Sequence, residues 1–279
     1  MTFIIGKRSN LSRRLFEKMG DSVQISASDI ENNIHTVLKY RNCEEVNIIF
    51  NNFQASTLLN QNNDFESYIT KSILNTSKLL TFLITNKIKI NKLIYTSSSS
   101  VYGNNKFCSE NNQVKPMNLQ GALKVSNEEM IKIFCEKHKI NYTIARVFNM
   151  YGGEDKFSIV SKIKDSYLED KVLNIINHGK AIRDYIYIDD VVKVYRRLID
   201  NVENLPKKLN IATGHGVRVM DLLHALENEN LEIKTNNIQR EEISTSIADV
   251  SALSEIIDVE KFKNVKNFLI HKLENENNN

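Results

Sequence analysis

The chain has few of the residues that build metal sites and disulfide frameworks. Its 279 residues include three cysteines and six histidines, and the histidines show no metal-ligand spacing. The cysteines, Cys43, Cys108 and Cys135, are odd in number and form no Cys-x-x-Cys pair. Scattered thiols of this kind are typical of a reducing compartment and do not indicate a disulfide scaffold. We therefore expect a cytoplasmic protein with free buried thiols and no metal site.

The sequence also lacks long apolar runs and a strong charge of one sign. Its longest apolar stretches, such as residues 79–84, are far too short to span a bilayer. The first residues lack the basic region, long apolar region and cleavage site of a signal peptide. The formal net charge is +3 at pH 7 and the lysines are dispersed, which gives no argument for nucleic-acid binding. We expect no membrane insertion and no nucleic-acid partner.

Apolar strands and amphipathic helices alternate through the first 150 residues. Strand patterns occur at 3–6, 23–27, 46–50, 92–96 and 142–147, and helix patterns at 11–19, 30–40, 65–85 and 120–137. Strands joined by helices of this length pair in parallel, so we predict an α/β fold with a Rossmann-like doubly wound parallel sheet in residues 1–150. The pattern is less regular in residues 151–273, which we assign to a smaller mixed α/β region that binds substrate. Residues 274–279 are expected to be a disordered tail.

One predicted strand and the helix after it carry a distinctive set of side chains. The strand runs into four serines at 97–100, and the helix presents Lys124 near its start. This arrangement resembles the catalytic core of the extended short-chain dehydrogenase/reductases, a family of nucleotide-sugar epimerases, dehydratases and ketoreductases. In that family, a Ser or Thr at the end of a strand is followed by Tyr-x-x-x-Lys at the start of a helix. Ser98 and Lys124 match this pattern, whereas Gln120 takes the place of the tyrosine.

The residue at position 120 decides which chemistry is available. The resemblance implies hydride transfer to or from a nicotinamide while a general acid/base moves a proton at the substrate oxygen. A tyrosine does this when a neighbouring ammonium stabilises its phenolate, but a glutamine cannot take up or release a proton near neutral pH. An active nucleotide-sugar epimerase or 4-ketoreductase would need another proton carrier, with Tyr102, or Lys124 acting through water, as candidates. The alternatives are a catalytically inactive relative that binds a nucleotide sugar or a partner protein, and a protein that senses NAD(P) without turnover.

The predicted cofactor loop is a reduced form of the family's Gly-x-x-Gly-x-x-Gly. It reads Gly6-Lys-Arg-Ser9-Asn-Leu-Ser12, so that two of the three glycines are serines. Residues 28–30, Ser-Asp-Ile, resemble a segment that follows the family's third strand, which implies that the second strand is missing and leaves NAD and NADP open. The resemblance implies that the dinucleotide contacts Gly6, Arg8, Ser9, Leu11, Asp29, Ile30, Asn51 and Lys124.

Two later segments resemble the family's substrate-binding motifs. Residues 146–152, Arg-Val-Phe-Asn-Met-Tyr-Gly, imply that Asn149 contacts a sugar diphosphate. Residues 183–190, Arg-Asp-Tyr-Ile-Tyr-Ile-Asp-Asp, imply that Arg183 binds a substrate phosphate, because a guanidinium fork suits phosphate oxygens. An ion pair of Arg183 with an acid such as Asp189 is the alternative. Together with Ser98, these residues would hold a nucleotide sugar.

The resemblance also bears on reaction type and assembly. Ser99 and Ser100 stand where the family's 4,6-dehydratases carry an Asp-Glu pair. Two serines cannot supply the acid and base for water elimination, so dehydratase activity is not expected. Family members often form homodimers through two long helices, which here would be those at 65–85 and 120–137. By analogy, the enzyme would serve the synthesis of bacterial surface polysaccharide precursors.

Overall fold

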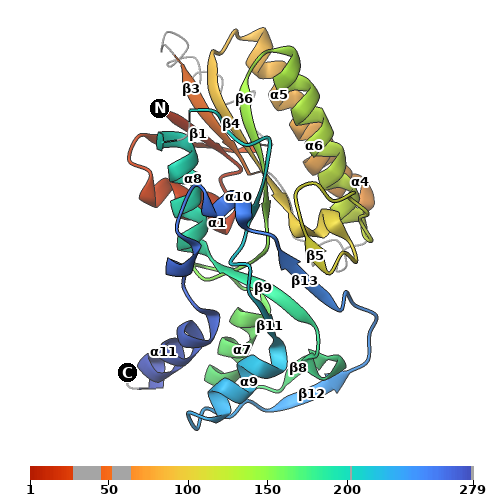
Figure 1. The fold of residues 1–279 in the computed structure, drawn as a ribbon, viewed down its shortest axis with the longest axis vertical. Helices are drawn as coiled ribbons and strands as arrows, with labels where there is room; N and C mark the ends of the chain where they lie inside the picture. Colours follow the sequence, from red (N-terminus) through yellow and green to blue (C-terminus); the bar gives the residue numbers. More distant parts are fainter. Residues whose placement is uncertain (28–44, 52–63, 202, 278–279) are drawn as a thin grey trace.

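The computed structural model describes residues 1–27, 45–51, 64–201 and 203–277 (Figure 1). Its upper half in Figure 1 is built on a six-stranded parallel sheet. The strands lie in the order β10-β6-β4-β3-β1-β2, and their bounds are β1 (Thr2–Ile5), β2 (Ser22–Ile25), β3 (Val46–Phe50), β4 (Ile90–Ser98), β6 (Asn141–Val147) and β10 (Lys208–Ile211). Every neighbouring pair is parallel. The prediction of a Rossmann-like α/β fold is confirmed.

Helices cover both faces of this sheet, which explains why its central strands are largely buried and rich in apolar residues. One face carries α5 (Asn75–Thr85) and α6 (Leu119–Lys137), and the other carries α1 (Asn10–Lys18) and α8 (Ile188–Asn201). Successive residues of a strand point to opposite faces. Ile5 therefore lies in the core beneath α5 and α6, whereas Ile4 lies in the core beneath α1 and α8.

Strand β2 lies directly beside β1, which corrects one expectation. Residues 2–5 pair in parallel with residues 22–25. The place next to the first strand is therefore filled, and the expectation of a missing second strand is wrong. Compared with the doubly wound order 3-2-1-4-5-6, the described sheet has no strand outside β2 and carries one additional strand, β10, beside β6. Ser26, which follows β2, thus reaches the same edge of the sheet as the loop after β1.

The long predicted helix before β4 contains one wider turn. It begins as α4 (Phe65–Ile69), passes through a π-helical turn, η2 (Thr70–Leu74), and continues as α5. Two hydroxyl groups bond to carbonyls of the preceding turn: Thr76 Oγ1 donates to Ser72 O at 2.6 Å, and Ser72 Oγ donates to Ile69 O at 3.2 Å. Such bonds bend helices, and π turns are frequent at functional sites.

The lower half in Figure 1 is a smaller mixed α/β unit. Its strands are β5 (Phe107–Cys108), β7 (Asn149–Tyr151), β8 (Leu173–Ile176), β9 (Ile182–Tyr187), β11 (Gly216–Arg218), β12 (Thr235–Ile238) and β13 (Thr245–Ala248), and its helices are α7 (Ile159–Leu168), α9 (Val219–Glu227) and α11 (Val265–Asn277). The short helix α10 (Ser251–Ser254) packs on β10. Tyr151, Leu173, Leu222 and Leu269 belong to a separate apolar core that holds the lower half together.

Two boundaries predicted from the sequence are wrong. The division at residue 150 assigns α8 and β10 to the substrate region, but β10 pairs with β6 and α8 packs on the upper sheet. The tail predicted to be disordered from residue 274 is helical through Asn277, at the end of α11. Lys272 pairs there with Glu276 at 2.9 Å, and such i,i+4 pairs favour helix over coil.

Candidate functional site

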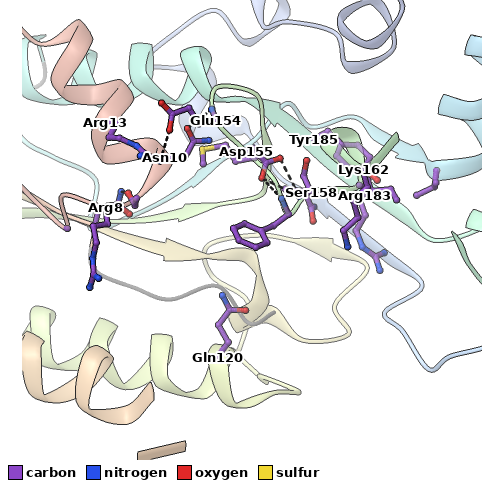
Figure 2. A pocket seen from close by; sticks show the side chains of 18 of the residues that line it. Arg8, Asn10, Arg13, Gln120, Glu154, Asp155, Ser158, Lys162, Arg183 and Tyr185 are labelled. Atoms are coloured by element: carbon purple, nitrogen blue, oxygen red, sulfur yellow. Dashed lines mark hydrogen bonds and ion pairs between the residues drawn. The ribbon is translucent and has the colours of Figure 1, made fainter. Parts of the chain in front are cut away.

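The two halves enclose a cleft of about 980 Å³ (Figure 2). We define its loop end by residues 6–9, Ser26, Ala27 and Lys71, and its β9 end by Lys162, Arg183, Tyr185 and Glu242. Gln120 and Asn149 also line the cleft. Figure 2 shows Arg8 at one side, Lys162, Arg183 and Tyr185 at the other, and Gln120 reaching in from α6. The cleft therefore joins the loop after β1 to the motif at 183–190.

The loop after β1 adopts a compact form that accepts serine at both altered positions. Gly6 has a positive φ of 114°, whereas Ser9 has a φ of −76°, which any residue adopts. Ser9 caps α1, because its Oγ accepts from Ser12 N at 3.0 Å. Asn51 Nδ2, from the end of β3, donates to Ser9 Oγ at 2.6 Å and to Ser12 Oγ at 3.0 Å. The loop thus leads from β1 through Gly6 to the capped N-terminus of α1, and a turn of this kind between a strand and a helix fits a dinucleotide pyrophosphate.

Four of the eight predicted dinucleotide contacts line the cleft; the other four are Leu11, Lys124, Asp29 and Ile30. Gly6, Arg8, Ser9 and Asn51 belong to its lining. Leu11 does not, because its side chain is buried in the core beneath α1. Asp29 and Ile30 lie outside the described residues.

Gln120 and Lys124 occupy different environments although they are one helical turn apart. Gln120 lines the cleft, but Lys124 is buried and does not. Lys124 Nζ donates to Thr96 O at 2.6 Å and lies 5.0 Å from the centre of the Tyr95 ring. Burial lowers the pKa of Lys124 to about 7, against a smaller opposing effect of Glu128. The structure therefore separates the predicted Gln120–Lys124 pair into a cleft residue and an interior amine.

Ser98 ends β4 and opens the 3-10 turn η3 (Ser99–Tyr102). Its Oγ accepts from Ser100 N at 3.2 Å, which satisfies the first free amide of that turn. The side chain is half-buried and is not part of the cleft lining.

Tyr102 is not available as a displaced proton carrier, so that candidate is wrong. The residue is fully buried, and its hydroxyl donates to Asn210 Oδ1 at 2.6 Å. The Arg146 guanidinium lies 4.8 Å from the centre of its ring. Burial raises the pKa of Tyr102 to about 12, which keeps it neutral. Tyr102 therefore joins β10 to η3 and does not reach the cleft.

Asn149 and Arg183 both line the cleft, as the substrate motifs predict. Asn149 Nδ2 donates to Asp184 O at 3.0 Å. Arg183 pairs with Glu242 at 3.3 Å, and not with Asp189, which instead accepts two hydrogen bonds from Arg14 at 2.5 and 2.7 Å. Arg183 therefore forms the ion pair that the alternative expects, but with Glu242 and not with Asp189, and its side chain lines the cleft.

Three further cleft residues are not predicted by sequence reasoning. Lys162 lies in the first turn of α7, and Lys71 is presented by the π turn. The hydroxyl of Tyr185 is buried without a hydrogen-bond partner among the described residues. A helical pattern at 157–169 together with the strand motif could have suggested Lys162 and Tyr185. Nothing in the sequence signals a π turn, so Lys71 could not have been found.

The loop after β7 is fixed to the start of α1 across the cleft. Asn10 Nδ2 donates to Gly152 O at 2.9 Å, and Asn10 Oδ1 accepts from Glu154 N at 2.9 Å. Arg13 adds an ion pair with Glu154 at 2.8 Å (Figure 2). Gly153 has a φ of +62°, and a Cβ there would lie 2.7 Å from Asn10 Oδ1. We call this contact the Asn10 latch.

Two kinds of site are absent from the part of the chain that the structure describes. No described helix is long and apolar enough to cross a membrane. No three His, Cys, Asp or Glu side chains converge as a metal-binding group within residues 1–27, 45–51, 64–201 and 203–277.

Comparisons with known proteins agree with this architecture. Protein CapI of Staphylococcus aureus is 30% identical over 194 residues, which cover 61% of this chain and 58% of that protein. UDP-glucuronate 4-epimerase 4 of Arabidopsis thaliana is 31% identical over 162 residues, covering 51% of this chain and 37% of that protein. The chain thus spans less than two thirds of the length of these and other curated relatives that it matches.

Solved structures share the whole fold at low sequence identity. UDP-glucuronic acid 4-epimerase from Bacillus cereus, solved with NAD and a substrate analogue, superposes with a TM-score of 0.83 at 20% identity and covers 98% of both chains. UDP-glucose 4-epimerase from Thermotoga maritima gives a TM-score of 0.80 at 20% identity, covering 100% of this chain and 99% of that one. The family model described as NAD dependent epimerase/dehydratase family matches residues 8–212. The chain therefore belongs to the NAD dependent epimerase/dehydratase family.

Proposed function

We propose that this chain binds a nucleotide sugar and a nicotinamide dinucleotide in the cleft and acts as a 4-epimerase or 4-ketoreductase. The observation that carries the proposal is the continuity of one cleft from Gly6, at positive φ before α1, to Arg183 and Lys162 at the β9 end. The first region suits a dinucleotide and the second suits a diphosphate. Membership in the family supports the same assignment.

The side chains around β4 and α6 limit how the reaction can proceed. A bound nicotinamide would supply hydride transfer to or from the sugar. Gln120 lines the cleft and can hold a reacting oxygen by hydrogen bonds, whereas Ser98 ends β4 outside that lining; neither side chain changes its protonation state near neutral pH. Lys124 titrates there, because its pKa is lowered to about 7. A general acid/base works best with a pKa near the operating pH, so we assign proton transfer to Lys124 through water.

The proposal excludes 4,6-dehydration, although the family as a whole includes dehydratases. The support is local: Ser99 and Ser100 in η3 offer hydroxyls and no carboxylate. Elimination of water needs both an acid and a base beside the sugar.

A second candidate function is binding without turnover. It is favoured by Gln120, which lines the cleft where the family has its tyrosine, and by the hydrogen bond that holds Lys124 Nζ on Thr96 O. In this case, the protein would bind a nucleotide sugar or a partner protein.

The wider setting extends the same proposal. We place the reaction in the cytoplasm and in the synthesis of bacterial surface polysaccharide precursors, by analogy with the family. We also propose a homodimer that packs α5 and α6 of two copies together.

Turnover measurements on the whole chain separate the two functions. Wild-type protein is incubated with NAD or NADP and with UDP-glucose or UDP-glucuronic acid, and the sugar is followed by NMR. The enzyme proposal predicts a new sugar nucleotide, a loss of at least about 100-fold in rate for Lys124→Met, and no such loss for Tyr102→Phe. Sugar-nucleotide binding with no product from the wild type would instead establish the second candidate.

A further inference from the structure

The place of β2 identifies the residue that would read the adenosine ribose of a dinucleotide. Gly6 N and Lys7 N both donate to Ile25 O, at 2.9 and 3.3 Å. The last residue of β2 is therefore bonded to the loop that holds the pyrophosphate. Ser26 follows immediately and lines the loop end of the cleft. In doubly wound folds, an acid in this region bonds to the ribose 2′-hydroxyl of NAD, and a nearby arginine accommodates the 2′-phosphate of NADP.

Ser26 has no charge with which to favour NAD. A carboxylate there would accept from the ribose hydroxyl and repel a phosphate on the same oxygen. A serine hydroxyl can donate to a phosphate oxygen as well as accept from a hydroxyl. Ala27, the next residue and also part of the lining, adds no charge. The described end of β2 thus carries no negative charge that would repel a phosphate group.

The cations at the same end favour a phosphate actively. Lys7 and Arg8 both belong to the loop after β1 and line the cleft. Arg8 pairs with no acid among the described residues, and Glu154, an acid of the cleft lining, is paired with Arg13 at 2.8 Å. A guanidinium presents a fork of donors that matches phosphate oxygens, and a single fixed positive charge nearby strengthens the contact.

We infer that the loop end of the cleft takes NADP(H) in preference to NAD(H), with Arg8 binding the 2′-phosphate and Ser26 permitting it. The inference rests on the cofactor part of the proposed function and is independent of which sugar is bound. It makes Arg8 and Ser26 specificity-determining residues.

The test is a fluorescence or calorimetric titration of the whole chain with NADPH and NADH, with dissociation constants as the readout and no turnover required. Wild type should bind NADPH at least about tenfold more tightly than NADH, the gain expected of one charge-assisted contact. Arg8→Met should remove most of this preference by weakening NADPH alone. Ser26→Asp should reverse it. Lys162→Met, at the β9 end, is the matched control and should leave the ratio unchanged.

Equal or tighter binding of NADH by the wild type would overturn the inference. A loss of that NADH binding in Asp29→Asn would then assign the ribose to Asp29, which lies outside the described residues. Titration with UDP-glucose, done separately, keeps the two proposals apart. NADPH preference without sugar-nucleotide binding would leave this inference standing and refute the proposed function. Sugar-nucleotide binding together with equal or tighter binding of NADH would overturn this inference alone, whereas sugar-nucleotide binding with no affinity for either dinucleotide would overturn both.

Discussion

At the scale of single residues, the proposed site depends on Gln120, which stands where the motif resemblance expects a tyrosine. Gln120 lines the cleft and can form hydrogen bonds, but its side-chain amide neither gains nor loses a proton near neutral pH. Lys124 lies one turn further along the same helix; its side chain is buried, and its Nζ donates to Thr96 O. Under the proposed function, the cleft has room for the dinucleotide, and Gln120 leaves proton transfer to another group.

Restoring the tyrosine tests this directly. Gln120→Tyr places a titratable hydroxyl at the cleft wall, one turn from Lys124, whose positive charge would stabilise a phenolate. We expect the rate of sugar-nucleotide conversion to rise by about 100-fold, the usual size of a positioned general acid/base. The gain is measured by NMR of the product and should vanish in the double variant with Lys124→Met. If the Gln120→Tyr variant binds its ligands but converts the sugar nucleotide no faster than wild type, then the cleft lacks more than a tyrosine hydroxyl.

The lowered pKa of Lys124 also predicts a pH dependence of stability. The folded protein binds the lysine proton only below about pH 7, whereas the unfolded chain binds it up to the ordinary value of 10.5. Between these values unfolding takes up a proton, so the free energy of unfolding contributed by Lys124 rises with pH, by at most about 1.4 kcal/mol per unit. Lys124→Met should remove this rise, as seen by urea denaturation at pH 7, 8 and 9. The same slope in both proteins would contradict the assignment.

At the scale of elements, the sequence predicts the regular part of the fold and misses the contacts between elements. Strands such as β3 and β6 are buried along most of their length and rich in apolar residues because helices cover both faces of the sheet, and that pattern is readable. Strands β5, β7 and β11 are two or three residues long, too short for a period to show. The motif at 183–190 leads to Arg183 on the cleft wall, but its partner Glu242 is 59 residues away and no local pattern links them.

The Asn10 latch gives a prediction about how α1 is held. Asn10→Ala removes two hydrogen bonds to the loop after β7 and should lower the free energy of unfolding by about 1–2 kcal/mol. Gly153→Ala should also destabilise, because φ is +62° and the new Cβ would press on Asn10 Oδ1.

The double variant Asn10→Ala/Gly153→Ala should lose less free energy of unfolding than the sum of the losses of the two single variants. In the Asn10→Ala background the amide that a Cβ would press on is gone, so we expect a coupling energy of about 1 kcal/mol in a double-mutant cycle by urea denaturation. Strict additivity would mean that the strain at Gly153 comes from its backbone angle alone.

At the scale of the whole molecule, the chain crosses between its halves more often than a boundary at residue 150 implies. After β7 and β9 in the lower half, the chain returns as α8 and β10 to complete the upper sheet. No composition change marks this return, because α8 and β10 have the same apolar pattern as the elements before them. The cleft between the halves is consequently walled by segments distant in sequence.

Assembly is also tested at this scale. Exposed apolar side chains on α4, η2, α5 and α6 are Phe65, Ile69, Leu74, Ile84 and Ile133. Packing such residues between two copies removes apolar surface from water, so we expect a dimer in sedimentation velocity. Ile133→Glu, at a position 62% exposed in the single chain, should give a folded monomer. Leu168→Glu, on the exposed end of α7, is the matched control and should remain dimeric. A wild-type monomer would refute the dimer.

Whether the cleft binds a sugar nucleotide is decided by a calorimetric titration of the wild-type chain with UDP-glucuronic acid and UDP-glucose, with and without NADPH. We expect saturable binding of a sugar nucleotide, a loss of about tenfold or more in affinity for Arg183→Met, and retention of affinity in Tyr102→Phe. Absence of binding by every sugar nucleotide under both conditions would contradict this expectation.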